Sequence, residues 1–157
     1  MKQIFTLITM AFLFTGTNAT AQKLTQLKDS DTALSIVQVQ IDGEDYTSVY
    51  LENDAFLAFY EYNGKLHFSN VWQKAGTQSY GEVEILEHTE KDDTVFMRLL
   101  WYYANSYDDH TGTAIILIQF IQRPVAVSFE LSMLTESAGL SVYKGYVNGS
   151  LNWKPYY

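Results

Sequence analysis

The side chains best suited to chemistry gather in one short stretch, WYYANSYDDH, at residues 101–110. It places four aromatic rings beside two carboxylates and an imidazole. Asp108, Asp109 and His110 are consecutive, so an extended backbone cannot point all three at one ion, and the alternating oxygen ligands of a calcium loop are missing. We interpret the stretch as the end of a buried strand followed by an acidic loop. The alternative is a rim that contacts a ligand, because binding residues concentrate on loops.

The remaining candidates for catalysis or metal binding lack the required spacing. The three histidines, His67, His88 and His110, include no H-x-x-x-H pair, and we interpret His67 and His88 as surface residues of strands. Nothing selects a catalytic pair among the 18 acidic residues, and the chain has no cysteine. G-x-S-x-G, P-loop and G-x-G-x-x-G patterns are absent as well. The sequence therefore predicts no catalytic residue, no metal site and no cofactor.

Tyrosine and tryptophan are the residues that favour a binding site. The chain has 12 Tyr, 9 Phe and 3 Trp, and Tyr and Trp combine an apolar body with a polar tip that suits sugars, peptides and small ligands. Four tyrosines recur at two-residue steps within adjacent predicted hairpins, where they would form a shared patch. The predicted ligand-binding residues are Tyr46, Tyr50, Tyr60, Tyr62, His67, Trp101, Tyr103 and Tyr107.

The elements that position these residues are predicted to be strands. Apolar residues alternate with period two, turn signals recur about every ten residues, and no run shows helical periodicity. Asp42-Gly43 and Asn63-Gly64 are strong hairpin signals. EDYTSVYLE is interpreted as a strand and KAGTQSYG as a loop. The predicted fold is all-β: a single antiparallel meander of roughly eight to nine strands, as a closed barrel or a two-sheet sandwich.

The facing of two segments follows from the same pattern. A two-residue turn at Asn63-Gly64 pairs Tyr62 with Lys65 and Tyr60 with His67. One face of this hairpin then forms core, with Leu57, Phe59, Leu66, Phe68 and Trp72. The strand TAIILIQFIQ is apolar on both faces, so we expect cover on each side or a cavity.

The start of the chain predicts export. Residues 1–21 resemble a cleaved secretory signal peptide, with a basic start, a short apolar run and cleavage between Ala21 and Gln22. Residues 22–33 form a polar lead-in segment and residues 34–157 a single all-β domain. The expected location is periplasmic or extracellular, in a bacterium. The net charge of −8 repels phosphate backbones, so nucleic acid is excluded as a partner.

These observations predict an exported, non-catalytic binding or interaction domain for a small apolar ligand, a glycan or a protein partner. One alternative is a small outer-membrane β-barrel, favoured by the leader and the terminal aromatic Tyr157. Against membrane insertion, the first segments are shorter than the roughly 9–11 residues of a transmembrane strand, and Pro155 would interrupt a closing strand. The other alternative is an all-β hydrolase without a local motif.

Overall fold

The computed structural model describes residues 32–148 of the chain. The predicted leader with its cleavage site, and the strand predicted after Gly149, lie outside these residues. The described elements are β1 (Thr32–Ile41), β2 (Glu44–Asp45), α3 (Thr47–Glu52), β3 (Ala55–Tyr62), β4 (Lys65–Trp72), β5 (Thr77–Lys91), β6 (Thr94–Asn105), β7 (Thr111–Gln122), β8 (Val127–Thr135) and β9 (Gly139–Val147).

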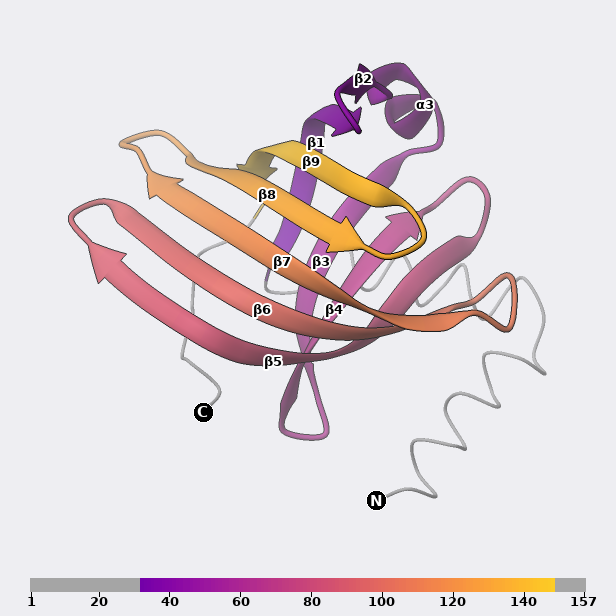
Figure 1. The fold of residues 1–157 in the computed structure, drawn as a ribbon. Coiled ribbons are helices and arrows are strands. Elements are labelled where there is room, and N and C mark those ends of the chain that lie inside the picture. Colours follow the sequence, from indigo (N-terminus) through magenta and orange to yellow (C-terminus); the bar gives the residue numbers. More distant parts are fainter. Residues whose placement is uncertain (1–31, 149–157) are drawn as a thin grey trace.

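The eight long strands form a closed antiparallel barrel in chain order, and the short β2 is an extra strand beside β1 (Figure 1). Closure depends on β1, which pairs with both ends of the meander. Residues 32–35 of β1 pair with β3, as in Ser35 opposite Phe56, and residues 34–41 pair with β9, as in Ile41 opposite Ser141. The register of β1 and β9 shifts between Ile36 and Gln38, an irregularity of the β-bulge type that bends a strand locally. The predicted all-β meander is confirmed, and it is a barrel.

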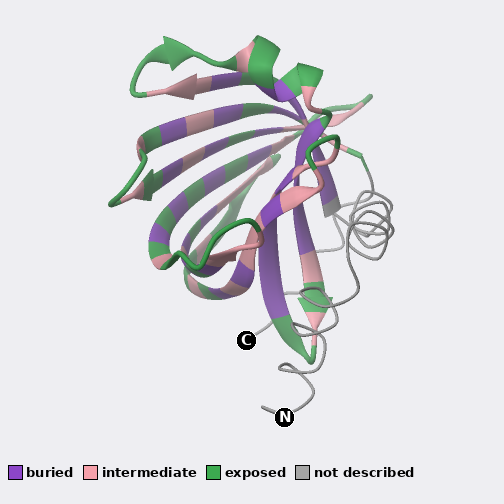
Figure 2. Ribbon diagram, turned by 90° about the vertical axis from the view of Figure 1, so that its right-hand side faces the viewer, coloured by how far each residue is buried: buried purple, intermediate pink, exposed green. Residues whose placement is uncertain are grey.

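Alternate residues of each strand face the barrel interior, and Figure 2 shows bands of buried and exposed residues on most strands. The strands β3 and β4 are buried on both faces over part of their length, and Phe56, Ala58 and Val71 form a second apolar cluster there. An eight-stranded barrel is just wide enough for side chains to fill it or for one small ligand to enter. The predicted core face of the hairpin formed by β3 and β4 is confirmed, because its residues belong to the main apolar cluster or pack against it. The largest fully buried side chains are Leu34, Leu57, Phe68, Met97, Leu99, Trp101, Ile116, Ile118, Phe120, Leu131 and Tyr143.

The turn at Asn63-Gly64 has the geometry that its residues predict. Both have positive φ, 52° for Asn63 and 74° for Gly64, as a two-residue hairpin turn requires. Tyr62 consequently pairs with Lys65 and Tyr60 with His67, as the sequence predicts.

The alternation of the segment EDYTSVYLE predicts a single strand, and this prediction is wrong. It forms β2 and then α3, a helix of six residues. The carboxylate of Asp45 accepts a hydrogen bond from the backbone N–H of Thr47 at 2.9 Å, which satisfies one free donor of the first turn. A helix this short is not stable alone, so it depends on packing of its buried Tyr50. Tyr46 and Tyr50 are four residues apart, a spacing that fits a helix as well as a strand.

Two other expectations are wrong. The predicted loop KAGTQSYG is largely strand, because β5 begins at Thr77 and pairs with β4 through backbone groups that need no apolar side chain. The strand TAIILIQFIQ, which corresponds to β7, is covered on its inner face only. Its outward residues Ile115 and Leu117 are 36% and 40% exposed.

None of the helices in residues 32–148 has the length and apolarity that crossing a membrane requires.

Candidate functional site

A cavity of about 540 Å³ opens at one end of the barrel. At this end β4, β6 and β8 finish and β5, β7 and β9 begin, and α3 lies beside it (Figure 1). The loops that join these strand pairs gather on the right in Figure 1. The lining has an aromatic floor and a rim of hydroxyl and amide side chains, and no described residue in it is acidic, lysine or arginine.

The aromatic side chains come from four elements that only the closed barrel brings together. Tyr50 of α3 lies with its ring centroid 4.7 Å from Trp72 of β4 and 5.7 Å from Tyr143 of β9. Trp101 and Tyr103 of β6 form a second pair, with centroids 4.9 Å apart. All five side chains line the cavity. A ligand could therefore contact ring edges and faces on α3, β4 and β9 and also on β6.

Hydroxyl groups connect the floor of the cavity. The hydroxyls of Tyr50 and Tyr143 are 3.2 Å apart, and Asn70 Nδ2 donates a hydrogen bond to the Tyr143 hydroxyl at 3.3 Å. Burial raises the pKa of the Tyr50 phenol and raises the pKa of the Tyr143 phenol well above its ordinary value of 10.0. Both phenols therefore stay protonated, and the floor carries no charge.

Two buried polar atoms of lining residues on the inward rows of their strands have no hydrogen-bond partner in the described chain. They are Asn70 Oδ1, an acceptor, and Trp101 Nε1, a donor. Each such atom costs about 1–3 kcal/mol when it is left unpaired. Gln78 Oε1 is also unpaired, but Gln78 pairs with Val71 on the outward row of β4, so we do not count it with the floor. A donor and an acceptor thus remain free among aromatic rings.

The acidic loop after β6 shapes the rim. Asp108 Oδ1 accepts hydrogen bonds from Asn105 Nδ2 at 3.0 Å and from the backbone N–H of His110 at 2.9 Å. His110 Nε2 in turn lies 3.2 Å from the Tyr103 hydroxyl. The carboxylate of Asp108 therefore holds the loop. Among the described residues, no three metal-ligating side chains lie close enough to share an ion.

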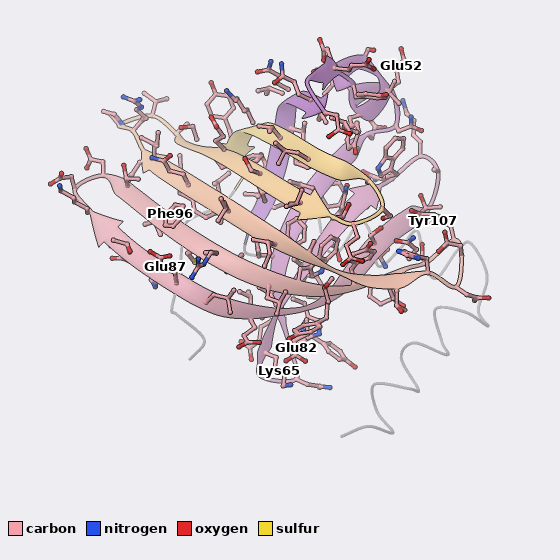
Figure 3. The ribbon with its side chains drawn as sticks, in the orientation of Figure 1. Glu52, Lys65, Glu82, Glu87, Phe96 and Tyr107 are labelled. Carbon is pink, nitrogen blue, oxygen red and sulfur yellow. The ribbon has the colours of Figure 1, made fainter. Side chains whose placement is uncertain are left out.

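The predicted binding residues divide into two groups. Four of them line the cavity: Tyr50, Trp101, Tyr103 and Tyr107, the last of which is 61% exposed and projects from the loop between β6 and β7 (Figure 3). The other four, Tyr46, Tyr60, Tyr62 and His67, do not line it. The structure does not bring the four tyrosines into one patch, because α3 turns Tyr50 into the barrel while Tyr60 and Tyr62 flank His67 on the outward face of the hairpin.

Three residues of the floor were not predicted as binding residues. Asn70 carried a signal, since it shares the inward row of β4 with Leu66, Phe68 and Trp72, and a polar residue in a core row needs a partner. Trp72 was predicted to lie in the core but was not predicted to bind a ligand. Tyr143 carried no local signal, because only barrel closure brings β9 to the hydroxyl of Tyr50.

His67 is not the surface residue that its strand position predicts, since only 4% of it is exposed. Its ring stacks on Tyr60 with centroids 5.6 Å apart, and its Nδ1 donates to the carbonyl oxygen of Lys65 at 3.1 Å. Burial lowers the pKa of His67 below 6.5, against the raising effects of that hydrogen bond and of the Glu82 carboxylate. The folded protein therefore binds a proton at His67 less readily than the unfolded chain does.

A pH dependence of stability follows. Folding is favoured by neutral His67 above about pH 6.5, and this contribution falls as the pH drops below that value, with a slope of at most about 1.4 kcal/mol per pH unit. We expect His67→Phe, which keeps a ring against Tyr60, to flatten the loss of unfolding free energy between pH 7.5 and 5.5. Urea unfolding at several pH values measures this slope. Equal slopes for the two proteins would contradict the assignment.

Comparison of the chain with protein-family models, with curated proteins and with solved structures gives no match.

Proposed function

We propose that this chain is a non-catalytic binding protein whose barrel takes a small uncharged ligand into the cavity at its open end. The observation that carries the proposal is the pair of unpaired polar atoms, Asn70 Oδ1 and Trp101 Nε1, buried among aromatic rings. The volume of about 540 Å³ falls in the range of roughly 300–1,000 Å³ that small-molecule sites occupy. Such sites are mostly apolar with a few polar groups that orient the ligand.

Binding is favoured over hydrolysis by the composition of the lining. General acid–base catalysis needs a group that exchanges a proton near the working pH, and glycoside hydrolysis needs two facing carboxyl groups. The described lining has no carboxylate, and its titratable groups are tyrosines and the exposed His110. A glycoside hydrolase would have to act without its usual pair of carboxyl groups, and His110 on the exposed rim has no carboxylate beside it among the described lining residues.

Charged residues on the outward face of the barrel argue against the alternative of an outer-membrane β-barrel. Arg98 of β6 lies 3.8 Å from Glu87 of β5, and Lys144 of β9 lies 3.2 Å from Glu130 of β8 (Glu87 is labelled in Figure 3). Charges at mid-strand on a lipid-facing surface cost about 2–4 kcal/mol for Arg or Lys, and membrane barrels enclose a polar interior. This barrel has an apolar interior. One outward row is apolar, with Leu100, Ile115, Leu134 and Leu140 in register.

Export remains part of the proposal. Its support is the leader in the sequence at residues 1–21, and the proposed site of action is periplasmic or extracellular. Sequencing the amino terminus of the protein purified from its native host tests the cleavage after Ala21.

The binding proposal is tested by filling the cavity. Ser141 of β9 faces inward between Ile41 and Met133, so Ser141→Phe should occupy the space with its ring. We expect saturable binding of the neutral fluorescent probe N-phenyl-1-naphthylamine by the unsubstituted protein and at least a tenfold loss of affinity in the variant. Ser132→Phe makes the same exchange on the outward face of β8 and is the matched control.

Circular dichroism establishes that both variants keep the β fold before their affinities are compared. Absence of saturable probe binding to the unsubstituted protein, or equal affinities in the two variants, would overturn the proposal.

A further inference from the structure

We infer that the ligand of this cavity is an uncharged aromatic molecule whose polar group both accepts and donates a hydrogen bond, as a phenol or a cyclic amide does. This inference rests on the proposed function and adds the chemical class of the ligand. Three properties of the floor carry it: its neutrality, its aromatic walls and its two unpaired atoms.

The neutral lining disfavours a charged ligand. No acidic, lysine or arginine side chain is present among the described lining residues, so an ion that leaves water would find no opposite charge there. The net charge of −8 adds a repulsion for anions. Aromatic rings do attract cations, but the buried Trp101 Nε1 has no hydrogen-bond partner in the described chain and requires an acceptor, which a cation does not supply.

The aromatic walls favour a planar ring. Tyr50, Trp72 and Tyr143 stand on one group of elements, and Trp101 and Tyr103 stand on β6. A ring inserted between the two groups stacks or makes edge contacts, whereas an alkyl chain gains only burial. A sugar carries several hydroxyl groups, and the described lining residues have three buried unpaired atoms, Asn70 Oδ1, Gln78 Oε1 and Trp101 Nε1, among walls that are mostly aromatic.

The two unpaired atoms set the polar group of the ligand. The indole N–H of Trp101 can only donate, and Oδ1 of Asn70 can only accept, while Nδ2 of Asn70 is engaged with Tyr143. The ligand must therefore supply one acceptor and one donor. A phenol hydroxyl supplies both from one oxygen, and a cyclic amide supplies them from its carbonyl and its N–H.

The first test compares matched ligands by titration calorimetry on the unsubstituted protein. We expect 2-naphthol or quinolin-2-one to bind, and 2-methoxynaphthalene, which accepts but cannot donate, to bind at least about tenfold more weakly because Asn70 Oδ1 stays unpaired. Which of the first two binds more tightly distinguishes a phenol from a cyclic amide. Tighter binding of 2-naphthoate or of a naphthylmethyl-trimethylammonium ion would overturn the inference, as would equal binding of 2-naphthol and its methyl ether.

The second test removes the donor from the protein. Trp101→Phe keeps a ring and loses the unpaired N–H, so the preference for 2-methoxynaphthalene, which accepts a hydrogen bond, over 2-ethylnaphthalene, which has a similar shape but cannot accept, should shrink about tenfold. Trp72→Phe makes the same exchange in the same cavity but removes no buried unpaired atom, so the preference should persist. A preference that changes equally in both variants would contradict the role of Trp101.

The two proposals fail differently. If N-phenyl-1-naphthylamine binds and Ser141→Phe weakens it, while naphthol and its methyl ether bind equally, only the ligand class is wrong. If neither the probe nor any of these ring compounds binds, the cavity is not a ligand site and both proposals fail.

Discussion

Gly81→Ala should destabilise the barrel by about 3 kcal/mol or more, or prevent it from folding. A Cβ built at Gly81 would overlap the backbone carbonyl oxygen of Tyr102 on β6, far inside van der Waals contact. The atom in the way is backbone, so no side-chain rotation relieves the overlap. The ladder between β5 and β6 pairs Tyr80 with Ala104 and then Val83 with Trp101, and the two strands approach closely where Gly81 lies between these pairs. The substitution would have to separate them at a wall of the cavity.

Urea unfolding followed by circular dichroism measures the effect. Gly64→Ala is the matched control: Gly64 has a φ of +74° but open space around its missing Cβ, so only the left-handed backbone conformation is penalised, by about 1–2 kcal/mol. If Gly81→Ala were no more destabilising than Gly64→Ala, the close approach of β5 and β6 would be wrong.

Phe68→Ala should have the other large effect, a loss of about 3–5 kcal/mol in the free energy of unfolding. Phe68 is fully buried inside β4, with its ring centroid 4.9 Å from that of Trp101 and 4.7 Å from that of Phe59. Removing the ring takes away the contact that supports Trp101 from within the barrel. The cavity should become deeper, and the variant should gain stability from N-phenyl-1-naphthylamine in proportion to RT ln(1 + [L]/Kd).

The control for Phe68→Ala is Leu117→Ala on the outward face of β7, where the side chain is 40% exposed and the expected loss is within about 1 kcal/mol. Urea unfolding of both variants, with and without the probe, gives the comparison. Similar losses of unfolding free energy in the two variants would show that the inward-facing residues of β4 do not stabilise the core.

Much of the local structure could be predicted from the sequence because its causes are local. Strand alternation has period two wherever one face is buried, and Asn63-Gly64 specifies a tight turn through backbone conformations that few other residues adopt. The pairing of Tyr60 with His67 followed from these two facts. The helix α3 could not be separated from a strand, because Tyr46 and Tyr50 fit either period and the packing of Tyr50 on the barrel decides between them.

The candidate site was predictable in part. Trp101, Tyr103 and Tyr107 stand where an apolar strand ends in a polar loop, and all three line the cavity. Tyr50 was predicted as a member of a tyrosine patch that the structure does not form, and α3 places it in the cavity instead. Asn70 was missed, although the sequence of its own strand places this polar residue in a row of core-facing residues, which indicates that it needs a hydrogen-bond partner.

The sequence alone determined the strands, most of their turns and which face of each hairpin is apolar, since these depend on neighbours within a few residues. Only the tertiary structure decided that the meander closes and that the closure leaves a cavity. Strands of a sandwich and of a barrel have the same alternation, so the choice depends on β1 pairing with β9 at the far end of the chain. The hydrogen bond between Tyr50 and Tyr143 joins residues separated by 93 positions, and no local pattern encodes a contact at that distance.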